Sequence, residues 1–200
     1  MCHQIASIPR EILEQVLEEI RIKNYVNELP DWPATRVNAF PKSQVPLFVF
    51  EQGALTIVDK TWGYPVAWSN NPIFNTRADT AMKAGGQNMW RDSLQHRRCI
   101  IPAFGFYEPH KTEKALSVKT GKEIKQQYFF TIPNEPLVFV AGIYEDRHFS
   151  MMTTNANRWM LPIHNRMPVV LRQNELDTWL GSQFEQLFDR SSFELHAEKI

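Results

Sequence analysis

The sequence predicts an α+β fold, a single domain with a curved, mainly antiparallel β-sheet core flanked by a few helices. Short apolar runs recur at close spacing between residues 45 and 171, whereas helical periodicity is confined to a few segments. A length of 200 residues is sufficient for one hydrophobic core. No repeat, linker or low-complexity segment divides the chain, so we expect residues 1–200 to form one domain.

The first expected elements are a helix and a hairpin. Residues 9–22 place their apolar side chains on one face and their charged side chains on the other; the apolar ones are Ile12, Leu13, Val16, Leu17 and Ile20. Residues 45–50 and 54–59 are apolar runs separated by a short polar segment that contains Gly53, which is typical of a β-hairpin.

The rest of the chain is mostly strand-like. Residues 78–96 are expected to be helical but irregular, because Gly85 and Gly86 interrupt them. Five further apolar runs are predicted to be strands, at residues 99–108, 126–133, 137–145, 148–154 and 167–171. A helix over residues 174–190, capped by Asn174, is expected to follow.

Composition excludes several classes of protein. A hydrophobic fraction of 43% and a charged fraction of 22% do not suit a disordered chain. No apolar run reaches the roughly 20 residues of a membrane-spanning helix, and no secretory signal begins the chain. Cys2 and Cys99 are too few for a disulfide framework. We therefore expect a cytoplasmic protein, nucleoid-associated if it is bacterial, with no membrane contact and no second subunit.

The charge of the chain is neutral only in total. Its 22 basic and 22 acidic side chains balance, which by itself argues against a nucleic-acid partner. However, residues 77–125 hold ten basic and five acidic groups, a charge of +5. Residues 9–31 (three basic, six acidic) and 173–200 (two basic, six acidic) are acidic. A basic face is therefore possible, although the lysines from Lys111 to Lys125 are expected mainly to solvate a long hairpin loop.

Cys2 is the most informative single residue. If the initiator Met1 is removed, Cys2 carries an amine and a thiol on adjacent carbons. The amine titrates near ~8 and the thiol near ~8.5, so both are usable nucleophiles at neutral pH. Such an aminothiol reacts with an aldehyde to form first an imine and then a five-membered thiazolidine ring.

Several motifs follow one another along the chain from Cys2 to Leu171: Cys2, WGYPVAW (62–68), NTRADT (75–80), RRCIIPAFGFYE (97–108), TTNAN (153–157) and IHNRMPVVL (163–171). In their order and spacing they resemble the SRAP family, the SOS-response-associated peptidases that are also described as abasic-site processing proteins and DNA–protein crosslink shields. The resemblance implies a reaction in which the N-terminal cysteine captures the aldehyde of an abasic site in single-stranded DNA as a stable thiazolidine.

The resemblance also implies roles for particular residues. Cys2 would be the nucleophile through its amine and its thiol, and Asn75 would position Cys2 or the sugar. Glu108 would act in acid–base steps, and His164 would shuttle protons during sugar ring opening. The residues implied in DNA binding are Arg77, Arg98, Trp68 and Thr154. No cofactor is implied, and the partner would be single-stranded DNA that contains abasic sites.

The sequence departs from the family's pattern at a few positions. The family usually begins Cys-Gly-Arg, whereas here His3 and Gln4 follow Cys2. The missing arginine would normally contact phosphate. Pro109 replaces a tryptophan that commonly follows the GFYE motif, and Asp79 and Asn165 are milder changes. The reactive residues are therefore retained, while the DNA groove differs.

Two other functions remain open from the residues. A thiol hydrolase would use Cys2 as nucleophile and His164 as base, and it would not need a free amine. A binding module with a vestigial pocket would explain the changes at Gln4 and Pro109. A metal site is not expected, because no ligand pair has zinc-finger or HExxH spacing.

Overall fold

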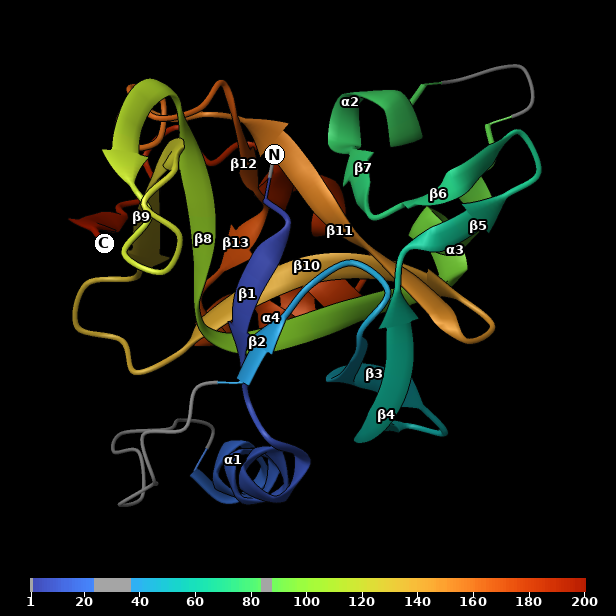
Figure 1. Cartoon of the computed structure of the whole chain (residues 1–200). Coiled ribbons are helices and arrows are strands. Elements are labelled where there is room, and N and C mark those ends of the chain that lie inside the picture. Colours follow the sequence, from blue (N-terminus) through green and yellow to red (C-terminus); the bar gives the residue numbers. More distant parts are fainter. Residues whose placement is uncertain (1, 24–36, 84–87) are drawn as a thin grey trace.

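The computed structural model describes residues 2–23, 37–83 and 88–200 (Figure 1). One large sheet contains the strands β1 (Gln4–Ser7), β2 (Val37–Ala39), β3 (Gln44–Glu51), β4 (Ala54–Trp62), β7 (Asn75–Arg77), β8 (Arg98–Leu116), β9 (Glu123–Thr131), β10 (Val138–Glu145), β11 (His148–Asn155), β12 (Arg166–Pro168), β13 (Val170–Leu171) and β14 (His196–Lys199). A separate sheet contains β5 (Tyr64–Val66) and β6 (Ser69–Ile73). The helical segments are α1 (Arg10–Lys23), α2 (Ala78–Ala81), α3 (Arg91–His96), η1 (Gln173–Glu175), α4 (Leu176–Leu180) and η2 (Phe184–Phe188). None of the helices in these described ranges is long and apolar enough to cross a membrane.

The strand pairings close part of the large sheet on itself. β8 pairs with both β3 and β10, β3 pairs with β4, and β11 pairs with both β4 and β10. The pairs of β11 with β4 and β7 are parallel, and the other pairings among the described strands are antiparallel. Figure 1 shows the resulting strong curvature, with α1 on one side and the N-terminus at the opposite end. The predicted fold class is confirmed.

β8 carries the curvature and leads to the candidate site. At Gly105 the neighbouring strand approaches so closely that a Cβ atom would lie 2.5 Å from the carbonyl oxygen of Phe130. Only glycine fits at such a contact. Farther along, the register of β8 against β9 shifts between Pro109 and Lys114. Proline has no N–H for the ladder, which suits it to this irregularity.

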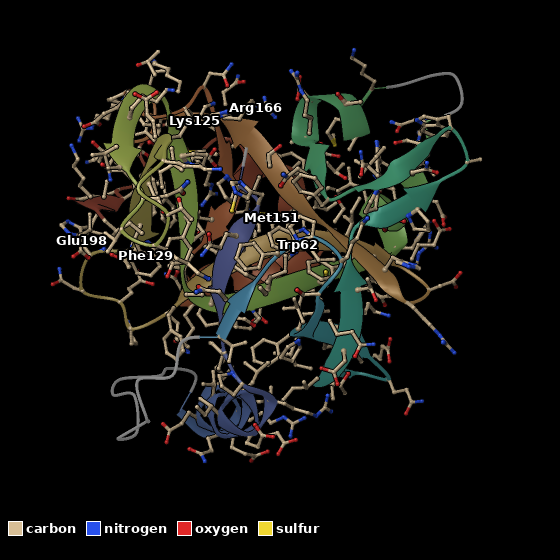
Figure 2. The ribbon with its side chains drawn as sticks, viewed as in Figure 1. Trp62, Lys125, Phe129, Met151, Arg166 and Glu198 are labelled. Carbon is tan, nitrogen blue, oxygen red and sulfur yellow. The ribbon has the colours of Figure 1, made fainter. Side chains whose placement is uncertain are left out.

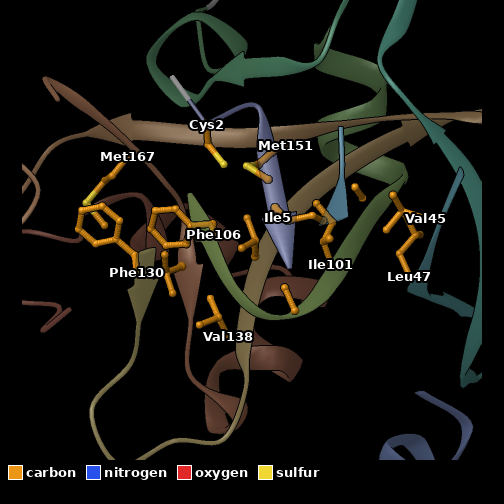
Figure 3. Packing of buried hydrophobic residues seen from close by; sticks show 14 of the residues in the cluster. Cys2, Ile5, Val45, Leu47, Ile101, Phe106, Phe130, Val138, Met151 and Met167 are labelled. Carbon is orange, nitrogen blue, oxygen red and sulfur yellow. The ribbon is translucent and has the colours of Figure 1, made fainter. Parts of the chain in front are cut away.

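The core lies on both faces of the sheet, because successive strand residues point to opposite sides. One cluster includes Cys2, Ile5 and Phe106, which are buried together (Figure 3). The rings of Phe106 and Phe130 stack there with centroids 5.1 Å apart. The other cluster packs against α1 and the C-terminal helical segments. The helix predicted over residues 9–22 is confirmed, and its buried positions include Leu13, Val16 and Leu17.

The predicted hairpin and four of the predicted strands are also confirmed, as β3–β4 and as β8 to β11. The run 167–171 forms two short strands, β12 and β13, instead of one. Residues 78–96 contain α2 and α3, and Gly85 and Gly86 lie outside the described residues. α2 ends early because the amide of Asn88 donates to the carbonyl oxygens of Thr80 and Ala81.

The prediction of one helix over residues 174–190 was wrong. The segment contains η1, α4 and η2, and Glu175 rather than Asn174 is the N-cap of α4. Gly181 has an extended backbone, so α4 ends after Leu180. The guanidinium of Arg98 donates hydrogen bonds to the carbonyl oxygens of Trp179, Leu180 and Gly181. A distant side chain thus satisfies the groups that a continuing helix would have paired.

Candidate active site around Cys2

Cys2 lies two residues before the start of β1, which pairs with β8. The register of Gln4 with Tyr107 leads the chain before β1 along the part of β8 that holds Glu108, and the charge of Glu108 acts on the Cys2 thiol. The Cys2 side chain is only 1% exposed, and its thiol donates to the carbonyl oxygen of Gln4 at 3.4 Å. Figure 3 shows the sulfur pointing into the core, toward Met151. Burial, and secondarily the charge of Glu108, raise the pKa of the Cys2 thiol, so the thiol is neutral at physiological pH.

Asn75 fixes the backbone of Cys2. It begins β7, which runs parallel to β11 and pairs with it in the register of Asn75 with Met151. The buried side-chain amide donates from Nδ2 to the carbonyl oxygen of Cys2 at 2.8 Å. Its Oδ1 atom has no hydrogen-bond partner among the described residues. Asn75 therefore holds Cys2 and also presents one buried acceptor at the site.

Glu108 is a fully buried carboxyl group on β8. Burial raises its pKa, whereas the nearby charge of Lys125 opposes this effect. A carboxyl group with a raised pKa keeps its proton to higher pH than an exposed glutamate does. Glu108 is therefore suited to acid–base chemistry beside Cys2.

His164 faces Glu108 from the segment before β12. Its Nε2 lies 3.9 Å from Oε1 of Glu108, and its Nδ1 accepts a hydrogen bond from the backbone N–H of Arg166 at 3.0 Å. Nδ1 also lies 3.2 Å from the carbonyl oxygen of Arg166, so Nδ1 faces backbone groups of Arg166 while Nε2 is the ring nitrogen turned toward Glu108. Partial burial and the positive charges of Lys125 and Lys111 lower the pKa of His164. The structure thus brings all four predicted reactive residues together.

Two charged residues for which no role in the site was predicted, Asp79 and Arg166, lie next to this site. The carboxylate of Asp79 accepts from Arg77 at 2.6 Å and from the buried Arg166 at 3.2 Å. The hydrogen bond from Arg77 is the main cause that lowers the pKa of Asp79. The sequence signal for Arg166 was its place in the IHNRMP motif, two residues after His164. One carboxylate shared by two guanidinium groups leaves positive charge at this edge.

The predicted DNA contacts lie in different environments. Arg77 is about half exposed beside Asp79, and Trp68 is 73% exposed in the turn between β5 and β6. Both are accessible to a ligand. The hydroxyl of Thr154 donates instead to the carbonyl oxygen of Phe188 at 2.7 Å, so this group is used within the protein.

Arg98 is not brought to the site. Its guanidinium donates to five backbone carbonyl oxygens, those of Leu94, Gln95, Trp179, Leu180 and Gly181. A guanidinium has five N–H donors, so none is left for a phosphate. The contacts of Arg98 support a structural role, not the predicted role in DNA binding.

The described residues also give no candidate metal centre. Within residues 2–23, 37–83 and 88–200, no three His, Cys, Asp or Glu side chains gather in a way that could hold a metal ion.

A curved, mainly antiparallel sheet, with a cysteine just before its N-terminal strand and with the buried Glu108 facing the partly buried His164, defines a protein with a candidate cysteine-centred site. Residues 1–197 match the family described as SOS response associated peptidase (SRAP), and the chain belongs to this family. The resemblance stated from the motifs is thereby confirmed.

The relatives extend from bacteria to mammals. The chain is 26% identical over 183 residues to the abasic site processing protein YoqW of Bacillus subtilis, covering 84% of this chain and 75% of that protein. It is 27% identical over 160 residues to YedK of Escherichia coli (76% and 67% covered) and 25% identical over 234 aligned positions to HMCES of Mus musculus (90% and 62% covered), which carry the same description.

Solved structures share the fold. A phage-related protein of Bordetella bronchiseptica superposes with a TM-score of 0.69 at 18% identity, covering 100% of this chain and 94% of that one. A protein of Bacteroides thetaiotaomicron gives a TM-score of 0.65 at 20% identity, with 100% and 92% covered. These similarities concern the fold alone.

Proposed function

We propose that this protein processes abasic sites by forming a covalent thiazolidine link between Cys2 and the sugar of an abasic nucleotide in single-stranded DNA. The observation that carries the proposal is the meeting of Cys2 with the buried Glu108 and the partly buried His164. The description of the curated relatives as abasic site processing proteins supports the same substrate. The proposal requires removal of Met1, which lies outside the described residues.

The atoms and electrons of the proposed reaction balance without a cofactor. The Cys2 amine adds to the aldehyde carbon of the ring-opened sugar, and loss of one water gives an imine. The sulfur then bonds to the same carbon while the thiol proton passes to the imine nitrogen, which closes the five-membered ring. The net reaction joins the aminothiol and the aldehyde and releases one water.

Glu108 and His164 suit the proton transfers in these steps. A proton on Nε2 of His164 would be donated to the sugar ring oxygen as the ring opens. Glu108 retains its proton to raised pH, so it can protonate the leaving hydroxyl and then accept a proton from the thiol. Burial raises the pKa of the Cys2 thiol, so ring closure needs a group that accepts the thiol proton, and Glu108 would fill this role.

A second activity would use the same residues. Hydrolysis of the peptide bond before Cys2 would generate the free amine, and the family's description as peptidases supports this step. Asn75 would hold the carbonyl side of Cys2 during that cleavage, because its amide already binds that carbonyl oxygen.

The test uses purified protein whose free Cys2 amine is confirmed by intact mass. We expect it to form an adduct with uracil-excised single-stranded DNA that survives denaturing electrophoresis, and Cys2→Ala to form none. Cys99→Ser is the matched control, because Cys99 is equally buried but lies within the chain, on β8, and so has no free amine. No adduct from a confirmed free amine would overturn the proposal. An adduct formed while Met1 is still attached would replace it with simple thiol addition.

A further inference from the structure

The end of β8, the turn and the start of β9 form a two-stranded ribbon that we name the arm (residues 114–125). Beyond the register shift, Lys114 pairs with Lys125 and Leu116 with Glu123. In Figure 1 this yellow-green hairpin curls over at the end of the molecule where the N-terminus lies, away from α1. The residues just before the arm are anchored: the Lys111 N–H donates to the carbonyl oxygen of Ile163 at 2.9 Å.

The turn at the tip of the arm is held by its own hydrogen bonds. The N–H of Gly121 donates to the carbonyl oxygen of Ser117 at 2.7 Å, and the N–H of Ser117 donates to that of Lys122 at 2.9 Å. Gly121 has a φ of 66°, a left-handed conformation that glycine adopts without strain. The tip is therefore built as a defined turn, which reduces the entropy lost when it binds a partner.

The arm carries positive charge that the protein does not neutralise. Lys114 forms an ion pair with Glu123 at 2.8 Å. Lys119, Lys122 and Lys125 are exposed and have no acidic partner among the described residues. Two lysines directly opposite each other across antiparallel strands destabilise a ribbon. The pair of Lys114 with Lys125 therefore has an energetic cost that a polyanionic partner would offset.

Apolar side chains accompany these lysines. Leu116 is 74% exposed and Val118, in the turn, is fully exposed. Within the described part of the chain, the structure offers no core for either side chain. Lysines interleaved with apolar side chains suit a nucleic-acid strand, whose phosphates and whose sugar and base faces present both kinds of surface.

The arm also adjoins the reactive site. β8 leads from Glu108 into it, and Lys125 is near enough for its charge to influence the pKa values of both Glu108 and His164. Figure 2 places Lys125 and Arg166 at the same end of the molecule. A strand whose abasic sugar reaches Cys2 would have its flanking phosphates within this region.

We propose that the arm binds the single-stranded DNA that flanks the abasic nucleotide, with Lys119 and Lys122 contacting phosphates and with Leu116 and Val118 packing on sugars or bases. This inference rests on the proposed function, because it names the surface that holds the same DNA. It assigns a binding role to the lysine-rich stretch that the sequence alone suggested was only solvated. It also supplies phosphate contacts in a chain that has Gln4 where the family usually has arginine.

The test measures reversible DNA binding, because this measurement does not depend on formation of the covalent adduct. The probe is single-stranded DNA with a tetrahydrofuran abasic analogue, which has no aldehyde, followed by fluorescence anisotropy from about 50 to about 200 mM salt. The variants are Lys119→Gln/Lys122→Gln and Leu116→Ser/Val118→Ser. The matched control is Arg91→Gln/Arg147→Gln, which removes two exposed charges outside the arm.

We expect the lysine variant to bind roughly tenfold more weakly and to lower the slope of log K against log salt by about 1.4, since each phosphate contact to a single strand contributes about 0.7. The apolar variant should bind more weakly with an unchanged slope, and the control should match wild type. Equal binding by wild type and both arm variants would overturn the inference. At saturating protein, both variants should still form the covalent adduct; a lost adduct there would show that the arm acts in the reaction and not in binding.

The outcome separates the two proposals. A wild-type protein that binds the analogue through the arm but forms no adduct with a reactive abasic site contradicts the proposed function alone. A wild-type protein that forms the adduct while the arm variants bind normally contradicts the arm inference alone.

Discussion

Nε2 of His164 lies 3.9 Å from Oε1 of Glu108, and burial moves the pKa values of these two groups toward each other. The carboxyl pKa rises from its ordinary 4.5 and the imidazole pKa falls from its ordinary 6.5. The distance exceeds a direct hydrogen bond but can be spanned by one substrate oxygen between them. The proposed exchange of protons between this pair and a bound sugar rests on this distance.

The Glu108 carboxyl group is expected to cost the protein stability at neutral pH. Because its folded pKa is raised, its favourable contribution is present below about pH 4.5 and is lost as the pH rises through the folded value. Glu108→Gln should therefore raise the melting temperature at about pH 7.5, by about 2–4 °C for each kcal/mol relieved. The same substitution should leave it unchanged at about pH 4. Thermal unfolding at the two pH values is the measurement, and a lower melting temperature at the higher pH would contradict the expected sign.

The same variant should be a poorer catalyst. Loss of a general acid–base group typically costs about 10²–10⁴-fold in rate. We expect Glu108→Gln to slow adduct formation within this range while leaving reversible binding to the unreactive analogue unchanged. Glu113→Gln is the matched control, since Glu113 lies on the same strand but pairs with Lys199 and Tyr128. A variant that loses binding and rate in equal proportion would mean that Glu108 holds DNA instead.

Asn75 should affect the position of Cys2 more than the stability of the fold. Asn75→Ala removes the hydrogen bond to the Cys2 carbonyl oxygen, a loss of about 0.5–1.5 kcal/mol. Asn75→Asp keeps the shape but replaces the donor with a second acceptor, so it should slow the reaction further. Single-turnover adduct formation measures both, with Asn71→Ala as a control at an exposed position. Equal rates for Asn75→Ala and Asn75→Asp would argue against a donor role.

Arg98 should matter for stability and not for DNA. Arg98→Lys leaves most of the five carbonyl oxygens without their donor, and a lysine lacks the planar fork that reaches them. We expect a loss of about 2–3 kcal/mol in the free energy of unfolding, measured by urea denaturation. Arg91→Lys, on the exposed face of α3, should change it by less than about 0.5 kcal/mol. Reduced DNA affinity in folded Arg98→Lys would restore the predicted binding role.

Trp68 and Arg77 should contribute to binding in distinguishable ways. Trp68→Ala should weaken binding by about 1–3 kcal/mol if the exposed ring stacks on one base, without changing the salt dependence. Arg77→Gln should instead lower the slope of log K against log salt by about 0.7, as expected for one phosphate. Anisotropy titrations at several salt concentrations separate the two. An unchanged affinity for Trp68→Ala would show that the turn between β5 and β6 does not touch the DNA.

Local sequence patterns were sufficient for the elements whose residues determine their own conformation. The amphipathic face of α1 and the apolar runs of β8 to β11 follow from periodicity within one segment. The short strands β1 and β14 were not predicted, because each is stabilised by pairing with a strand far along the chain. The helix predicted over residues 174–190 failed for the same reason, since Arg98 ends α4 from a distant strand.

The properties of the candidate site also divide into those set by residue type and those set by folding. The residue types establish which groups are present: the thiol of Cys2 and the acid, base and amide of Glu108, His164 and Asn75. Folding brings these groups together, buries Cys2 and Glu108, and turns Nε2 of His164 toward the carboxyl group. Residue type sets the kinds of bond a side chain can make. Its pKa, its partners and its access to solvent depend on neighbours that are brought close only when the sheet closes.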